Sequence, residues 1–418
     1  MNEIPAPAAL LPWAPERTGE AAPAPERRPP AALAELGLAL RLAWRQLRAE
    51  RARLATAIAG VMFACVLVFM QLGFKGALFD SATNLLQALR ADLFLWHPLT
   101  EASFRPERMP RSRAHQALAD PEVVRAIPVY LAQLPLRNPE TGTKRAVQVI
   151  GFDAAAGALR FPGIEQVAEA LTRPDTFAFD LRSRPEFGPL PRLFNERGPF
   201  MVELNGRAME LVGLVEIGPS FGADGNVVMS EVNFRRVFER RPSHIDLVAI
   251  QLAEGADPAA VQARLRALLP GDVSVLTHAE LVQKERRYWE DGTPIGFIFL
   301  FGSVMGLVVG MVIVYQILFA DIAGHLGEYA TLKAMGYTDG YLARVVLGAA
   351  LILAVVGFIP GFLLCLFLYD FVAGATFLPL VMTAERALGV FLLIFGMCFA
   401  AGLLAIRKLR DANPADMF

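Results

Sequence analysis

The chain has 418 residues, of which 54% are hydrophobic and only 19% are charged, and its formal net charge is −1. Soluble domains usually carry about a quarter charged residues, so this composition argues against a soluble protein and for a membrane protein. The near-neutral charge gives no sign of a nucleic-acid partner. The three cysteines, Cys65, Cys365 and Cys398, lie within apolar runs, so no disulfide is expected to hold the hydrophilic part together.

The N-terminal part divides into two segments. Residues 1–32 are rich in proline and alanine, and this predicts a disordered cytoplasmic tail. Residues 33–53 place apolar side chains at helical spacing with arginines between them. That pattern predicts an amphipathic cytoplasmic helix at the membrane face, leading into the first membrane span.

Four apolar runs are each long enough to cross the roughly 30 Å hydrocarbon core of a bilayer. The runs cover residues 54–74, 293–320, 345–369 and 387–406. None of them contains Asp, Glu, Lys, Arg or His, which argues against a secondary transporter, because ion-coupled carriers usually need such groups at depth. The sequence therefore predicts four transmembrane helices.

Basic residues flank both ends of this membrane region. Five arginines lie between residues 41 and 53, and Arg407, Lys408 and Arg410 follow the fourth run. Because cytoplasmic flanks carry an excess of Lys and Arg, both ends of the chain are expected in the cytoplasm. The resulting segments are a cytoplasmic loop at 321–344, a cytoplasmic C-terminus at 407–418, and periplasmic segments at 75–292 and 370–386.

The long hydrophilic segment, residues 75–292, is expected to fold as a large α+β periplasmic domain inserted between the first and second transmembrane helices. Alternating residues around Asn205-Gly206 predict a strand pair with a two-residue turn. Residues 134–152 predict a second hairpin with a longer turn. A mixture of hairpins and helices is typical of an α+β fold.

Helix signals lie toward the end of this domain. Asp257 precedes Pro258 as an N-cap before the first helical position. Thr277 and Glu280 form a capping box for a helix that leads to the second span. Glycine and proline at 292–294 predict a bend at the membrane surface.

Two motifs in the domain raise the question of chemistry. The stretch "GPSFG" around Ser220 matches G-x-S-x-G, but a nucleophile there needs a strand, a sharp turn and a helix, whereas a loop-and-strand pattern follows. The stretch "ADGN" at 223–226 lacks the spacing and closing Glu of a calcium loop. The five histidines have no metal-ligand spacing. No catalytic, cofactor-binding or metal residue is predicted, and a membrane-bound hydrolase is the remote alternative.

The second apolar run carries Gly302, Gly306 and Gly310. Glycines four residues apart form a flat strip on which another helix packs closely. The strip predicts helix packing, either within the chain or across a dimer.

A short polar island, "HLGEYATLKAMGYTDGYL" at 325–342, separates the second and third runs. It reads as a weakly amphipathic helix that Gly336 ends as a C-cap. One interpretation is a turn that lies on the membrane, and the other is a helix that docks into a cytoplasmic partner.

The stretch "GEYATLKAMGYTDGYLARVVLGAALILAVVGFIPG" resembles the signature of the FtsX-like permease superfamily, whose pattern is roughly E-x-x-x-L-K-A-x-G, and it is closest to DevC-type permeases. Further similarity lies in "LAWRQLRAERARLATAIAGVMFACVLVFMQLGF", "ALRADLFLWHP" and "NGRAMELVGLVEIGPSFGADGNVVMSEVNFRRVF". The resemblance covers about residues 38–412. It implies a permease subunit of a MacB-like, type VII ABC exporter in the bacterial inner membrane.

Such a permease implies partners. A separate ABC ATPase dimer would bind ATP and Mg under two permease chains, and a periplasmic membrane fusion protein and a TolC-like outer-membrane channel would complete the export path. The chain, with no P-loop motif of its own, would transmit motion rather than act as an enzyme and would bind no cofactor. The resemblance assigns contact with the ATPase to Glu328, Lys333, Ala334, Met335 and Gly336.

The resemblance leaves the exported substrate open, and DevC-type relatives suggest a glycolipid or another amphiphile. Two alternatives come from the same superfamily. One is an FtsX-like regulator that activates a cell-wall hydrolase, and the other is a permease that releases lipoproteins from the membrane.

Overall fold

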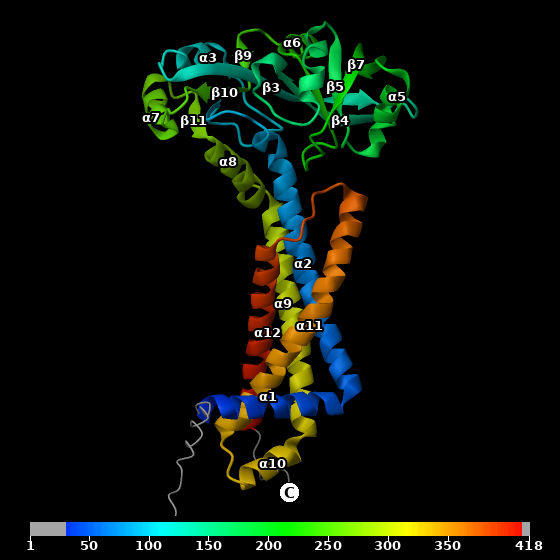
Figure 1. The fold of residues 1–418 in the computed structure, drawn as a ribbon, viewed down its shortest axis with the longest axis vertical. Coiled ribbons are helices and arrows are strands. Elements are labelled where there is room, and N and C mark those ends of the chain that lie inside the picture. Colours follow the sequence, from blue (N-terminus) through cyan, green and yellow to red (C-terminus); the bar gives the residue numbers. More distant parts are fainter. Residues whose placement is uncertain (1–30, 412–418) are drawn as a thin grey trace, which may run out of the picture.

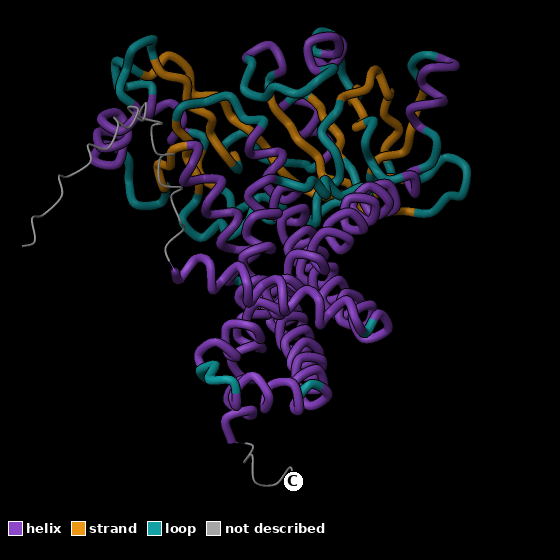
Figure 2. The backbone as a smooth tube through the Cα atoms, turned by 60° about the horizontal axis from the view of Figure 1, so that its bottom comes forward, coloured by secondary structure: helices purple, strands orange, loops and turns teal. Residues whose placement is uncertain are grey.

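The structure, a computed structural model, describes residues 31–411. The disorder predicted for residues 1–32 thus lies outside the described part, except that Ala31 and Ala32 belong to the first helix. The described chain forms a bundle of long helices with a sheet domain mounted at one end (Figure 1). In Figure 2 the strands gather in one region beyond the ends of the long helices.

Within residues 31–411, four helices are long and apolar enough to cross a membrane. They are α2 (Arg51–Gln87), α9 (Pro294–Gly324), α11 (Asp339–Thr376) and α12 (Ala384–Asp411). The sheet domain lies between the first and second of them, as the fold-class prediction required. The chain is therefore a multi-pass membrane protein with an inserted domain.

Two of these helices extend well past the predicted spans. At about 1.5 Å per residue, the 37 residues of α2 reach about 55 Å, far more than the roughly 30 Å of a bilayer core. The chain thus does not leave its helix at residue 75, because α2 continues to Gln87 and carries the sheet domain. Likewise α11 continues to Thr376, which shortens the predicted 370–386 loop to residues 377–383.

The helix predicted for residues 33–53 is divided in two. α1 (Ala31–Ala49) ends before Glu50, which is the N-cap residue of α2. α1 lies across the end of the bundle that is farthest from the sheet domain (Figure 1).

The inserted domain is built on a nine-stranded mixed sheet with the order β11-β1-β10-β3-β4-β8-β5-β7-β6. A further pairing of Leu136 in β3 with Leu204 in β6 curls the second half of this sheet toward closure. Apolar side chains cover both faces of the sheet. The strands are β1 (Leu93–Trp96), β3 (Val123–Arg137), β4 (Lys144–Phe152), β5 (Thr176–Asp180), β6 (Phe200–Leu204), β7 (Arg207–Val215), β8 (Asn226–Met229), β10 (Leu247–Leu252) and β11 (Ser274–Thr277), with β2 (Met109–Pro110) and β9 (His244–Ile245) as a separate pair.

Short helices surround this sheet, and side chains from one of them block its free edge at β11. The Val275 carbonyl accepts hydrogen bonds from Gln262 and Arg266 of α7, so this part of the edge is occupied. The helices are α3 (Ser112–Ala117), α4 (Ile164–Val167), α5 (Leu190–Arg197), α6 (Glu231–Val237), α7 (Pro258–Leu268) and α8 (His278–Asp291).

The local signals in the sequence are confirmed. Asn205 and Gly206 have φ of 51° and 78° between β6 and β7, as a two-residue hairpin turn requires. The longer hairpin is β3–β4. Asp257 caps α7, and Thr277 forms the capping box of α8 with Glu280.

The bend predicted at 292–294 is instead a break between two helices. α8 ends at Asp291, and α9 begins at Pro294 with the Thr293 hydroxyl accepting from the Ile295 N–H. Because proline has no N–H and fits the first turn of a helix, the break lies just before Pro294.

Candidate coupling site

The polar island forms one short helix between two long ones. α10 (Leu326–Ala334) follows α9, with His325 as the C-cap of α9. Gly336 has φ of +94°, and the Tyr337 N–H donates to the Leu332 carbonyl at 3.1 Å. These are the features of a Schellman motif, so the prediction that Gly336 ends this helix is confirmed.

The residues assigned to ATPase contact lie at this turn. Glu328 and Gly336 are exposed, and the Met335 side chain is 64% exposed. Lys333 and Ala334 belong to α10, but their side chains lie outside the described part of the chain. The exposed residues present a surface at the end of the bundle opposite the sheet domain (Figure 1).

Two contacts of α10 have no signal in the sequence. Tyr329 is only 4% exposed and packs into the core of the helix bundle. The Gln46 amide of α1 donates to the Glu328 carboxylate at 3.5 Å, across 282 residues of sequence. α10 is thus anchored on the bundle by Tyr329, with Leu326 and Leu332 partly buried against the same core, and it touches α1 through a long hydrogen bond.

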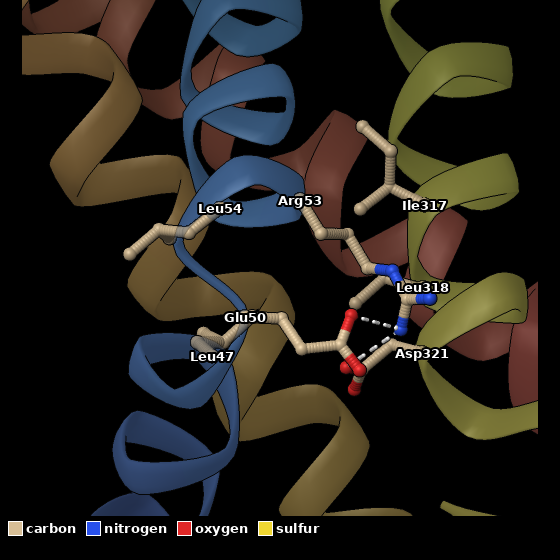
Figure 3. A pocket seen from close by; sticks show the side chains of 7 residues that line it. All are labelled: Leu47, Glu50, Arg53, Leu54, Ile317, Leu318 and Asp321. Atoms are coloured by element: carbon tan, nitrogen blue, oxygen red, sulfur yellow. Dashed lines mark ion pairs between the residues drawn. The ribbon is translucent and has the colours of Figure 1, made fainter. Parts of the chain in front are cut away.

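A cluster of charges joins the α1–α2 break to the last turn of α9 (Figure 3). Arg53 lies 2.8 Å from the Glu50 carboxylate and 3.9 Å from the Asp321 carboxylate. His325 lies 3.6 Å from Asp321, which is 6% exposed. A buried acid in the last turn of a helix is disfavoured by the helix dipole, and the Arg53 guanidinium offsets part of this cost. We call this cluster, together with α10, the α10 joint.

The small cavity in this cluster is lined by Leu47, Ile317 and Leu318 as well as by the charged side chains (Figure 3). Its volume of about 10 Å³ is no more than one water molecule needs. The cavity therefore offers no room for a small-molecule ligand.

The glycine strip of α9 packs on α2 of the same chain. A Cβ at Gly310 would lie 2.5 Å from Cβ of Ala64 and 2.6 Å from Sδ of Met397. A Cβ at Gly306 would lie 3.3 Å from Cβ of Leu67, and one at Gly302 would meet the end of the Gln71 side chain. Of the two packing modes that the sequence left open, the structure has the intrachain one.

A second joint lies at the other end of α9, where α8 meets it. Trp289 is 5% exposed, and its ring lies 5.0 Å from Phe221 and 5.5 Å from Phe104. Tyr288 packs against the same indole at 5.2 Å. We call these four aromatic residues and Glu285 the domain joint.

Glu285 is the polar centre of the domain joint. Its carboxylate accepts from the Ser103 N–H at 2.8 Å, the Ser103 hydroxyl at 3.1 Å and the Trp289 indole N–H at 3.2 Å. Burial raises the pKa of Glu285 above its ordinary value, because removal from water disfavours the charged form, although these hydrogen bonds oppose the shift.

The "GPSFG" stretch supplies Phe221 to this joint. Asp180, which is fully buried, accepts from the N–H groups of Ile217 and Gly218 and from the Asn226 amide. This network fixes the start of a loop that leads to strand β8 rather than to a helix. Ser220 therefore lacks the strand–turn–helix setting of a hydrolase nucleophile, and the loop instead delivers an aromatic ring to the α8–α9 break.

In the "ADGN" stretch, the acidic side chain is already paired with arginines of the same chain. Asp224 lies 2.7 Å from Arg145 and 3.3 Å from Arg184. Among the described residues, no group of three or more His, Cys, Asp or Glu side chains is arranged to hold a metal. The geometry thus favours a turn over a calcium site.

Comparison with known proteins identifies the C-terminal part. Residues 300–414 match the family model described as FtsX-like permease C-terminal. No curated protein matches the sequence of this chain.

Solved structures give weaker likenesses. The periplasmic region of MacB from Actinobacillus actinomycetemcomitans is 10% identical, with 47% of this chain and 94% of that chain covered and a TM-score of 0.35. The extracellular domain of the noncanonic ABC-type transporter YknZ from Gram-positive bacteria is 12% identical, with 45% and 99% covered and a TM-score of 0.33. Values this low support no inference about function.

The matched residues contain most of α9 and all of α10, α11 and α12, so they include three of the four membrane helices and the α9–α10 part of the α10 joint. The chain is thus a multi-pass membrane protein whose C-terminal part, residues 300–414, matches the FtsX-like permease C-terminal family.

Proposed function

We propose that this chain is the permease subunit of a MacB-like ABC exporter and that it converts ATP-driven movement of a partner into movement of its sheet domain. The observation that carries this proposal is the FtsX-like match over the helices that surround α10. The arrangement supports it, because α9 connects an exposed turn at one end of the bundle directly to the domain joint at the other. A rigid helix between two joints suits a lever.

The partner at the α10 joint is an ABC ATPase dimer, which binds ATP and Mg. The chain has no P-loop motif, so it acts without hydrolysing ATP by that route and is not an enzyme. The contact with the ATPase is formed by Glu328, Lys333, Ala334, Met335 and Gly336. Two copies of the chain bind one ATPase dimer.

The orientation of the chain in the membrane is inferred from the arginines around the start of α2. By the positive-inside rule, the α10 joint and both chain ends lie in the cytoplasm, the helices cross the inner membrane, and the sheet domain lies in the periplasm. There the domain works with a membrane fusion protein and a TolC-like channel to export a glycolipid or another amphiphile.

The test combines affinity purification from native membranes with an export assay. A tagged wild-type chain is expected to co-purify an ABC ATPase and a membrane fusion protein. Gly336→Ala places a Cβ at φ of +94°, which is strained for any L-residue, so it should reduce ATPase recovery and export without reducing the amount of chain in the membrane.

Gly327→Ala is the matched control, because Gly327 lies in the same short helix, has no positive φ and has open space around it. This variant should keep the ATPase and export. Normal export by Gly336→Ala would contradict the coupling role. Recovery of a cell-wall hydrolase system in place of a membrane fusion protein would replace export with regulation.

A further inference from the structure

One face of α1 is buried against the bundle. Ala39 and Ala43 are fully buried and Leu47 is 5% exposed, at the spacing of one helix face. Leu40 approaches the backbone of α11, where a Cβ on Gly348 would lie 3.2 Å from its Cδ2. The helix therefore lies flat against the bundle, across its end (Figure 1).

The opposite face of α1 is cationic and aromatic. Arg41, Arg45 and Arg48 are exposed and lie three or four residues apart, which aligns them along the helix. Trp44 between them is 40% exposed and Leu38 is 51% exposed. None of the three arginines forms an ion pair with a side chain that the structure describes.

The position of α1 along the length of the bundle is set by its short connection to α2. α2, the first membrane helix, begins at Arg51, only one residue after α1 ends. α1 therefore lies where the chain enters the membrane, and its exposed face points away from the bundle at the depth of lipid headgroups. Arginines beside tryptophan at that depth are typical of a helix that binds an anionic lipid surface.

We propose that Arg41, Arg45 and Arg48 bind the phosphate headgroups of anionic phospholipids, and that this contact holds α1 against α10. The second half follows from the hydrogen bond between Gln46 and Glu328. Gln46 is 7% exposed and lies toward the buried face of the same helix, so lipid bound on one face of α1 steadies the contact on the other. This inference rests on the membrane bundle alone and does not need the transport activity.

The first experiment measures quenching of Trp44 fluorescence in nanodiscs. Full-length chain is placed in phosphatidylcholine discs that contain a small fraction of brominated phosphatidylglycerol or of brominated phosphatidylcholine. A Trp44→Phe chain gives the background from the other tryptophans. Each arginine near an anionic surface contributes about a fivefold preference, so the brominated anionic lipid should quench Trp44 severalfold more strongly. Equal quenching by both lipids would overturn the proposal.

Two variants separate charge from fold. Arg41→Gln, Arg45→Gln and Arg48→Gln together should bring the quenching ratio to about one, while lysine at the same three positions should keep most of the preference, because both residue types carry the charge. Arg287→Gln removes an exposed arginine at the other end of the bundle and should leave the ratio unchanged. An unchanged ratio in the triple glutamine variant would assign the preference to other residues and refute the arginine contact.

The second experiment follows α10. Backbone hydrogen exchange of residues 326–334 should be slower in discs that contain phosphatidylglycerol than in pure phosphatidylcholine discs, because the lipid holds α1 in place. This difference should vanish in the triple glutamine variant. Equal exchange of the wild-type helix in both discs would refute the link between the lipid contact and α10.

Discussion

The domain joint and the α10 joint lie at opposite ends of α9 and are built from different kinds of contact. The domain joint buries Trp289 among three aromatic rings around a carboxylate that has three donors. The α10 joint has two ion pairs of Arg53, at 2.8 and 3.9 Å, a contact of 3.6 Å between His325 and Asp321 and a hydrogen bond of 3.5 Å, beside an exposed surface at Met335.

This difference in contacts predicts which of the two joints opens more easily. Loss of a buried aromatic side chain costs several kcal/mol. Long or partly exposed polar contacts contribute only about 1 kcal/mol or less each. In the proposed lever, the α10 joint is therefore the end that rearranges when a partner binds. The domain joint is the end that keeps the sheet domain in register with α9.

The largest effect is expected at the domain joint. Trp289→Ala removes a buried indole from three aromatic neighbours and leaves Glu285 without one of its donors, so it should lower the free energy of unfolding by about 3–5 kcal/mol. Thermal unfolding of the purified chain in detergent measures the loss. Leu99→Ala is the control, because Leu99 is 74% exposed and should change stability by less than about 0.5 kcal/mol. Similar midpoints for the two variants would show that the joint does not depend on this packing.

The next effect lies on the helix between the joints. Gly310→Ala forces a methyl group to within 2.5 Å of Ala64 and 2.6 Å of Met397, and such overpacking costs about 1–3 kcal/mol. Gly389→Ala in α12 has open space around the new Cβ and should stabilise its helix by up to about 1 kcal/mol. Thermal unfolding of the two variants should therefore shift in opposite directions. Equal shifts would mean that α9 and α2 are not in close contact.

Much of this architecture could be predicted from the sequence. Apolar runs specify membrane helices, and local signals such as Asn205-Gly206 and the Thr277–Glu280 box specify turns and helix starts, because each depends on neighbouring residues only. Hydropathy alone does not show how far these helices continue beyond the spans: the apolar run stops at Lys75, while α2 continues to Gln87, packs against α8 and places Leu86 in the core of the sheet domain.

The joints themselves could not be predicted. Phe221 meets Trp289 across 68 positions, and Gln46 meets Glu328 across 282. Such pairs depend on how separately formed elements pack, and no spacing rule reaches that far. The sequence located the α10 turn through Gly336, but the anchoring role of Tyr329 is visible only in the folded chain.

A smaller effect, which depends on pH, is expected on the stability of the domain joint. The pKa of Glu285 is raised above its ordinary value of 4.5, so the folded state holds a proton that the unfolded state releases. The stability that this group contributes is complete below pH 4.5 and is lost as pH rises through the raised value. As pH rises from 4.5 through the raised pKa, the wild type should therefore lose stability relative to Glu285→Gln in thermal unfolding.

Glu280→Gln is the matched control for this experiment. The backbone N–H of Thr277 helps to lower the pKa of Glu280 below 4.5, so its titration acts mainly at lower pH. The difference between wild type and this variant should change much less over the same range. A constant difference for Glu285→Gln as well would mean that this carboxylate remains charged in the folded chain.

The smallest effect on stability is expected at the α10 joint. Gln46→Ala removes one hydrogen bond of 3.5 Å to a Glu328 that water also reaches, so the free energy of unfolding should fall by about 1 kcal/mol or less. Hydrogen exchange should nevertheless become faster in residues 326–334, while exchange in α7 stays the same, because local opening depends on local contacts. If α10 exchanged at the wild-type rate, the apolar contacts of Tyr329, Leu326 and Leu332 would hold this helix, and the weak polar contacts that distinguish the α10 joint from the domain joint would have no part in its position.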